Sequence, residues 1–308
     1  MAFFVSALTL AFFLAYLNLT LPHSSVNNHA SFHYATAVNE FQPLTPHNSL
    51  ATILLSKPSL SKHRVFYVCI LILLSGDIET NPGPSHATTE LSHTLFPSES
   101  SFTLCSYNTR SASNEDHTIY LHDFASSYNP NCFALTETWL KCSTTPSQYL
   151  SIPPPGYHMI CANRDSLHPN ALGGGVAFII HKSITILSTS TYSFSSFEAL
   201  SVKLDLTSSN LSVLNIYRPP PGSPYHQPFS VFLSEIEPLL SSFATMSHPF
   251  IITGDFNIHL DNPNEPHTIT FSSLLSSVNL IQHVTFPTHK SNHTLDLVIT
   301  SEDPALKP

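Results

Sequence analysis

The sequence contains few charged residues. Asp, Glu, Lys and Arg make up 10% of its 308 residues, and the formal net charge is −9. Residues 101–308 hold 15 acidic and 8 basic side chains, so no strongly basic surface is expected there. This balance argues against binding of nucleic acid by broad electrostatic attraction. It is compatible with a site that uses carboxylates to hold a cation.

The sequence also lacks the cysteine spacing of a zinc site. Its five cysteines, at positions 69, 105, 132, 142 and 161, form no C-x-x-C pair. We interpret them as reduced intracellular thiols in strands. Because G-K-[ST] is absent, the glycine run 173–175 does not form a P-loop, and we interpret it as a tight turn that enters a strand.

The first 64 residues have no clear globular pattern. Met1–Leu21 is apolar, uncharged and about long enough to span a bilayer. It lacks the basic start of a signal peptide, although Ala35–Ala37 is a distant cleavage candidate. Two interpretations stay open: a membrane or secretory leader, and a leader that need not fold. Residues 22–64 lack sustained periodicity and are expected to be loop or disorder.

A second apolar run, 65–74, is too short to span a bilayer and precedes the stretch GDIETNPGP, residues 76–84. Pro82 and Pro84 fix φ and lack an N–H, so any helix built on 65–76 must end here. A helix end followed by a linker turn is one interpretation. However, the stretch also fits D-x-E-x-N-P-G-P, and its fixed positions are Asp77, Glu79, Asn81, Pro82, Gly83 and Pro84.

This pattern resembles the 2A-like ribosome-skipping peptides of picornaviruses and of some non-LTR retrotransposons. The resemblance implies that residues 65–84 act on the ribosome during translation, so that the Gly83–Pro84 bond is not made. The products would then be 1–83 and 84–308. The leader could direct the first product to a membrane or the secretory route, and the second would be nuclear or cytoplasmic.

Residues 85–101 are typical of a linker, and an α/β pattern begins at residue 102. Helices are expected over 114–128, with Asn114 as N-cap, over 229–245, interrupted by Pro238, and over 268–280. Short β-rich runs alternate with them. They cover residues 102–109, 132–140, 157–162, 174–181, 198–206, 211–217, 249–258 and 294–300. Strands mixed with helices predict sheets that are covered by helices.

Polar side chains recur at the ends of these apolar strands. Burying a carboxylate without a partner is costly, so several at one sheet edge indicate a cation or a shared role. Oxygen ligands without cysteine or paired histidine favour Mg²⁺ or Mn²⁺. Each residue alone also has a structural interpretation, such as a turn cap, an exposed strand-end charge or an Asx turn. The residues concerned are Asn108, Glu137, Tyr217, Arg218, Asp255, Asn257 and Asp296.

Six motifs occur in an order that resembles the endonuclease/exonuclease/phosphatase family, and in particular its apurinic-endonuclease-like branch in non-LTR (LINE-type) retrotransposons. They are SYNTRS (106–111), LTETWL (135–140), GGGVAFII (173–180), NIYRPP (215–220), GDFNIHLD (254–261) and HTLDLVIT (293–300). The resemblance covers about residues 102–308. It implies a four-layer α/β sandwich, with two mixed sheets flanked by helices, and Mg²⁺-dependent phosphodiester hydrolysis by a DNA-nicking endonuclease.

The resemblance also implies roles for single residues. Glu137 would be the metal ligand, with Asn108 beside it. Asp255 would activate the attacking water, and Asn257 would contact the phosphate. Tyr217 would donate to the phosphate or stabilise the nucleophile, and Asp296 matches the aspartate of the penultimate motif. Arg218 could reach a phosphate, but its position beside three prolines also permits a structural role.

One family motif is missing from the sequence. The family ends with an Asp-His pair after the last strand, whereas here Glu302 and Asp303 are followed by Pro304. His289 and His293 do not match that histidine. We therefore expect a domain that is incomplete at its C-terminus, with weak or no nuclease activity. Two alternatives stay open: a catalytically inactive retrotransposon remnant, and a phosphoesterase of the same fold that acts on phosphoinositides or other phosphoesters.

Overall fold

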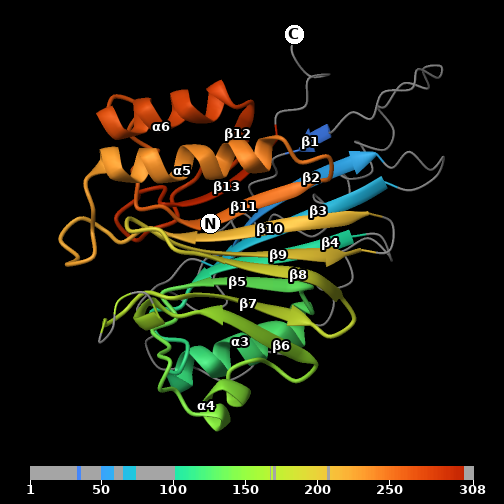
Figure 1. Ribbon diagram of the computed structural model, residues 1–308. Helices are drawn as coiled ribbons and strands as arrows, with labels where there is room; N and C mark the ends of the chain where they lie inside the picture. Colours follow the sequence, from blue (N-terminus) through green and yellow to red (C-terminus); the bar gives the residue numbers. More distant parts are fainter. Residues whose placement is uncertain are drawn as a thin grey trace, which may run out of the picture.

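Two β-sheets pack face to face, and helices cover their outer sides (Figure 1). The computed structural model describes residues 101–301, except 167, 169, 170, 207 and 208, together with the segments 33–35, 50–58 and 65–73. The proposed ribosome-skipping residues, most of the predicted linker and residues 302–308 lie outside the described residues.

The first sheet has the strand order β1-β2-β3-β4-β5-β7-β6. Strands β4 and β5 run parallel, and β7 and β6 continue the sheet with antiparallel pairings. The strands are β1 (His33–Ala35), β2 (Leu50–Pro58), β3 (Val65–Leu73), β4 (Ser101–Asn108), β5 (Cys132–Thr136), β6 (Tyr157–Ala162) and β7 (Val176–His181).

The second sheet has the order β12-β13-β11-β10-β9-β8. Its central strands β10 and β11 are parallel, and β13 pairs antiparallel with β11. The strands are β8 (Thr185–Tyr192), β9 (Glu198–Asp205), β10 (Asn210–Tyr217), β11 (Phe250–Asp255), β12 (Leu280–Gln282) and β13 (Asp296–Ser301).

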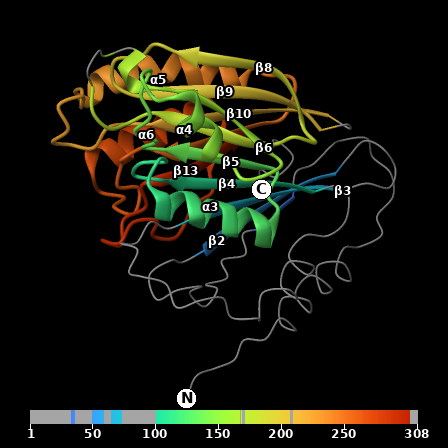
Figure 2. The same cartoon turned by 90° about the horizontal axis from the view of Figure 1, so that it is seen from below.

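The core lies in three layers that follow from this arrangement. Phe178, Val202 and Val213 belong to the apolar layer between the sheets. Helices α3 (Glu115–Tyr128) and α4 (Pro146–Ser151) lie outside the first sheet, and α5 (Phe229–Ala244) and α6 (Pro266–Ser277) lie outside the second (Figures 1 and 2). The helices bury Phe124 and Phe232 against the two sheets. The predicted α/β fold with two mixed sheets flanked by helices is therefore confirmed.

The three predicted helices are present, but α6 covers 266–277 where 268–280 was predicted, because Leu280 already begins β12. Asn114 caps α3 as expected, because its side chain accepts a hydrogen bond from the backbone N–H of Asp116. Helix α5, by contrast, continues through Pro238. Pro238 lies on the exposed side of α5, where solvent can satisfy the carbonyl that its missing N–H leaves unpaired.

The apolar run before GDIETNPGP forms a strand and not a helix. Strand β3 pairs in parallel with β4, from Tyr67 opposite Ser101 to Leu73 opposite Tyr107. Strand β2, in a region expected to be loop, pairs antiparallel with β3. A short apolar run does not distinguish a strand from a buried helix by periodicity alone. Within the described residues, no helix is long and apolar enough to cross a membrane.

Candidate active site

The polar strand ends predicted from the sequence meet at one edge of the two sheets. In the first sheet, Asn108 ends β4 and lies opposite Thr136, the residue before Glu137. In the second sheet, Tyr217 ends β10 and lies opposite Asp255, which ends β11. Asp296 begins the antiparallel strand β13, directly opposite Asp255. The C-terminal ends of the parallel strands and the N-terminal end of the antiparallel strand β13 therefore lie at this edge.

Asn108 connects the two sheets at this edge. Its Nδ2 donates to Oε1 of Glu137 and to Oδ2 of Asp255, each at 3.0 Å. Its Oδ1 accepts from the backbone N–H of Arg110 at 3.3 Å. Residues separated by 147 positions in the chain are thus held within one hydrogen-bonded group. The two carboxylates share a single neutral donor.

Burial and neighbouring charge raise the pKa values of Asp255 and Asp296 at this edge. The pKa of Asp255 lies well above its ordinary value because the side chain is buried, and because Asp296 and Glu137 are close. Burial, followed by the charge of Glu137, raises the pKa of Asp296 to about 7. A bound cation would favour the ionised forms of both groups.

Tyr217 supplies a neutral donor beside these carboxylates. Its side chain is only 4% exposed. Burial raises the pKa of Tyr217, and the nearby charges of Glu137 and Asp255 raise it further. The phenol therefore stays protonated at neutral pH and can donate a hydrogen bond to a phosphate oxygen.

Asn257 and Arg218 form a buried turn behind the carboxylates. The N–H of Asn257 donates to Oδ1 of Asp255 at 3.1 Å, and its Nδ2 donates to the carbonyl of Arg218 at 2.7 Å. Arg218 is 3% exposed, and its Nη1 donates to the carbonyl of Asn257 at 3.1 Å. Burial lowers the pKa of Arg218 to about 10. These contacts favour the structural role of Arg218, and its phosphate-binding role stays a prediction.

Glu137 lies in a strained turn that backbone hydrogen bonds support. Glu137 and Trp139 have φ values of 51° and 54°, which are unusual for residues other than glycine. The carbonyl of Glu137 accepts from Ser111 N at 2.8 Å and from Thr109 Oγ1 at 3.2 Å. Strain of this kind persists where surrounding contacts hold it, and it is concentrated at functional sites.

Two further residues support the edge and were not predicted as site residues. Asn215, fully buried on β10, donates from Nδ2 to the carbonyls of Leu135 at 2.8 Å and Ala177 at 3.2 Å in the other sheet. Thr288 Oγ1 accepts from the N–H groups of Leu295 and Asp296, each at 3.0 Å. Asn215 stands in the NIYRPP motif, which was the available signal, whereas Thr288 had none.

The histidines near β13 do not pair with the carboxylates described above. His293 Nδ1 lies 3.0 Å from Oδ2 of Asp261, and its ring stacks on that of His259 with the centroids 4.0 Å apart. His289 bonds through its backbone N–H to the carbonyl of His293 at 3.0 Å. The sequence analysis gave neither histidine the catalytic role.

The donor set at the edge fits a hard divalent cation. Asp255 and Asp296 have raised pKa values. The side chain of Asn108 connects Glu137 to Asp255 by hydrogen bonds. In the described residues, no group of three or more His, Cys, Asp or Glu side chains has the geometry of a metal site. Mg²⁺ commonly binds one or two carboxylates and keeps several waters, so Glu137, with Asn108 beside it, would be sufficient.

Comparison with known proteins identifies the family. The model of the endonuclease/exonuclease/phosphatase family matches residues 105–307. The chain therefore belongs to this family. No curated protein matches the sequence.

Solved structures are similar to this chain at low sequence identity. The AP endonuclease LMAP from Leishmania major aligns with a TM-score of 0.51 and 14% identity, over 64% of this chain and 78% of that one. The human Nocturnin catalytic domain aligns with a TM-score of 0.43 and 18% identity, over 63% and 79%. The 3′ phosphatase NExo from Neisseria aligns with a TM-score of 0.45 and 14% identity, over 66% and 87%.

Proposed function

We propose that the domain over residues 102–308 is a Mg²⁺-dependent phosphodiesterase that nicks DNA, as the endonuclease of a non-LTR retrotransposon would. One observation carries the proposal. Asn108 Nδ2 lies 3.0 Å from carboxylate oxygens of both Glu137 and Asp255, which supports the roles proposed for them, a metal ligand and a general base from different sheets. Mn²⁺ would satisfy the same oxygen ligands. The partner is DNA, held by contacts at this edge and not by a broad basic surface.

The residues at the edge would divide the chemistry between them. Glu137, with Asn108 beside it, would hold the ion, which polarises the phosphoryl oxygen and stabilises the leaving alkoxide when bound. Asp255 would accept the proton of the attacking water, a role that suits a buried carboxylate whose pKa lies above its ordinary value. Tyr217 and Asn257 would donate to the phosphate oxygens, and Asp296 would complete the acidic group.

Nicking of supercoiled plasmid by the full chain with Mg²⁺ tests the proposal. Glu137→Gln and Asp255→Asn should each abolish nicking, because each removes a charge and keeps the shape of the side chain. Asp123→Asn is the matched control, since Asp123 is an exposed carboxylate on α3. Nicking that survives both substitutions at the edge would refute the proposal. Hydrolysis of a phosphomonoester without nicking would favour the phosphoesterase alternative.

We also propose that turnover is slow. The support is the sequence, in which Glu302 and Asp303 are followed by Pro304 where the family motif has an Asp-His pair. Loss of one member of a cooperating catalytic group costs orders of magnitude in rate. Single-turnover assays at enzyme excess would detect slow nicking, and the absence of any nicking would favour the inactive remnant.

We propose separately that residues 65–84 cause ribosome skipping, which leaves 84–308 in the nucleus or cytoplasm and the leader free to reach a membrane or the secretory route. The support is the sequence pattern that contains Asn81, Pro82, Gly83 and Pro84. Translation in a eukaryotic lysate should give two products, and Pro84→Ala should give one. A single full-length product from both templates would refute this proposal.

A further inference from the structure

A buried ion pair lies beside Tyr217 of the candidate active site. Arg164, in the short 3₁₀ helix η1 (Arg164–Ser166), donates from Nε to Oε1 of Glu198 on β9 at 2.5 Å. Arg164 is 4% exposed and Glu198 9% exposed. Burial raises the pKa of Glu198, while the attraction of Arg164 and the hydrogen bond from Gly175 oppose this shift. Neither side chain was predicted as a site residue.

This ion pair fixes the glycine loop 173–175. Oε2 of Glu198 accepts a hydrogen bond from Gly175 N, and Arg164 Nη1 donates to the carbonyl of Leu172 at 3.1 Å. The guanidinium lies directly against Gly174, where a Cβ atom would be 2.2 Å from Arg164 Cζ. The glycine run is therefore more than a tight turn, because it lets the backbone wrap closely around the pair.

The glycine loop in turn fixes the segment that carries Glu137. Thr138 N donates to the carbonyl of Gly175 at 3.2 Å, and Trp139 N donates to that of Gly174 at 2.7 Å. These are the two residues that follow Glu137, in the turn with φ values of 51° and 54° at Glu137 and Trp139. A continuous set of hydrogen bonds thus leads from the ion pair to the proposed metal ligand.

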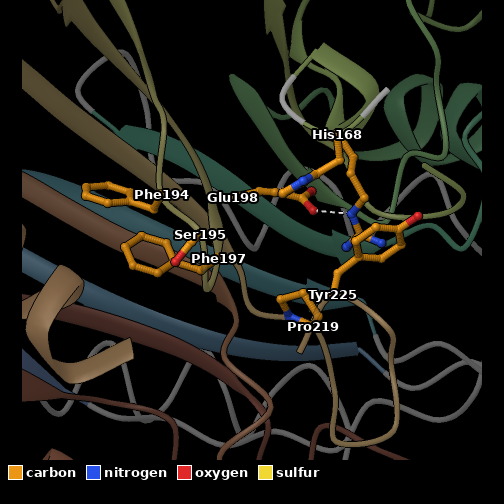
Figure 3. A pocket seen from close by; sticks show the side chains of 8 residues that line it. His168, Phe194, Ser195, Phe197, Glu198, Pro219 and Tyr225 are labelled. Atoms are coloured by element: carbon orange, nitrogen blue, oxygen red, sulfur yellow. Dashed lines mark hydrogen bonds and ion pairs between the residues drawn. The ribbon is translucent and has the colours of Figure 1, made fainter. Parts of the chain in front are cut away.

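The same guanidinium also lies beside Tyr217, the proposed phosphate donor. Arg164 Cζ is 5.5 Å from the ring centroid of Tyr217 and 4.7 Å from that of Tyr225. Glu198 is the strand partner of Tyr217, in the antiparallel register of β9 and β10. Figure 3 shows Glu198 with its ion pair dashed, between the rings of Phe194 and Phe197 on one side and Tyr225 and His168 on the other.

We propose that Arg164 and Glu198 are positioning residues of the nuclease site. They act through the glycine loop on Glu137 and through ring contact on Tyr217, without touching the substrate. This inference rests on the proposed function for its catalytic consequence. Its structural part, that the ion pair stabilises the backbone hydrogen bonds of Thr138 and Trp139, can be measured without any nicking activity.

The test uses the double variant Arg164→Met/Glu198→Leu in the full chain. Replacing a buried ion pair by apolar side chains of similar volume often leaves stability unchanged, so this variant should fold. It removes the acceptor of Gly175 N and the donor to Leu172. We expect the Mg²⁺ concentration for half-maximal nicking to rise about tenfold or more. kcat should fall and KM for DNA should stay unchanged.

Single variants and a control distinguish positioning from general destabilisation. Glu198→Gln keeps an acceptor for Gly175 N and should lose less activity than Arg164→Met, which leaves Glu198 buried and unpaired. Arg164→Lys keeps the charge but loses the forked contact, so it should restore activity only in part. Tyr157→Phe is the control, because it removes a buried hydrogen bond to Pro130 at the opposite end of the sheet. It should leave the Mg²⁺ dependence unchanged.

Amide hydrogen exchange gives the readout that does not depend on catalysis. The amides of Thr138 and Trp139 should exchange about tenfold or more faster in the double variant, and at the wild-type rate in Tyr157→Phe. Unchanged exchange of these amides in the folded double variant would overturn the inference, whether or not the protein nicks DNA. If the amides exchange faster in the double variant but the wild-type protein never nicks DNA, the proposed function alone would be refuted.

Discussion

Asn108 is the residue whose loss should disturb the site most directly. Its Nδ2 donates to both Glu137 and Asp255, so removing it leaves two carboxylates at a buried edge without their shared donor. We expect Asn108→Ala to lower nicking by roughly 10- to 100-fold. A plasmid assay at saturating Mg²⁺ measures this effect.

A matched Asn→Ala change provides the control. Asn114 caps α3 by accepting from Asp116 N at 2.9 Å, away from the carboxylates. Asn114→Ala should cost about 1 kcal/mol of stability, as lost N-caps do, and leave nicking unchanged. Equal losses of activity in the two variants would show that Asn108 acts only through stability.

Substitution of Arg218 can distinguish its structural role from its phosphate-binding role. Its Nη1 donates to the carbonyls of Asn257 and Phe256, and its guanidinium lies 5.0 Å from the ring centroid of Phe232. Arg218→Lys should therefore destabilise the fold by roughly 2 kcal/mol, because a buried ammonium cannot reproduce these contacts. KM for DNA should not change. A raised KM with unchanged stability would instead support phosphate binding by Arg218.

At the scale of elements, the edge of β4 depends on a segment that precedes the proposed skipping site. Strand β3 covers β4 in parallel, and skipping at Gly83–Pro84 would place these strands on different polypeptides. An uncovered strand edge favours pairing with another chain. We therefore expect 84–308 to self-associate more than the full chain carrying Pro84→Ala, as measured by light scattering after size exclusion.

A synthetic peptide completes that comparison. The peptide 50–73 contains β2 and β3, and when added to 84–308 it should reduce self-association by occupying the edge of β4. If 84–308 is monomeric without the peptide, then β3 is dispensable for covering that edge. The pairing of β3 with β4 would then have no role in keeping the released product monomeric.

The elements around the site could be predicted from the sequence, but the contacts between them could not. Polar residues after apolar runs indicated that Asn108, Glu137, Tyr217 and Asp255 lie at strand ends, because strand boundaries are local features. The contact of Asn108 with Asp255 joins residues from different sheets, and only the packing of the two sheets determines it. Arg164 had no local signal, since its partners are separated from it along the chain.

Local rules also failed where solvent or tertiary pairing compensated for an unfavourable residue. Pro238 was expected to interrupt a helix, yet it is tolerated on the exposed side of α5. The run 65–73 was compatible with a helix, yet its backbone pairs with β4. In both cases the tertiary environment of the segment decides its structure, and the sequence window does not contain that environment.

At the scale of the whole molecule, two buried groups should make the free energy of unfolding change with pH in opposite directions. Burial lowers the pKa of His283 from 6.5 to about 4. Burial and Glu137 raise the pKa of Asp296 from 3.8 to about 7. Between the folded and unfolded pKa values of the histidine, the unfolded chain holds more protons on that group. Between the two pKa values of the aspartate, the folded chain holds more. The net slope of stability with pH is therefore the difference of two opposing contributions.

Substituting each group isolates its contribution. Above pH 6.5, His283 is neutral in both the folded and the unfolded chain, so it does not lower stability. As pH falls towards 4, the unfolded chain takes up a proton on this histidine and the folded chain does not, so the free energy of unfolding falls by about 3 kcal/mol at most. His283→Gln should remove this loss, so the free energy of unfolding of wild type relative to the variant should fall as pH falls. Urea titrations from pH 4.5 to 7.5, without divalent cations, measure this difference. Parallel curves would contradict the assigned shift.

Asp296→Asn should give a difference of the opposite sign in the same titrations. Wild type loses stability as pH rises towards 7, because the buried carboxylate must ionise near Glu137 and Asp255. The variant has no proton to lose, so it should become progressively more stable than wild type over that range. Mg²⁺ should reduce the difference if it binds at this edge, because a cation favours the ionised aspartate. A difference that Mg²⁺ does not change would argue against a metal ion beside Asp296.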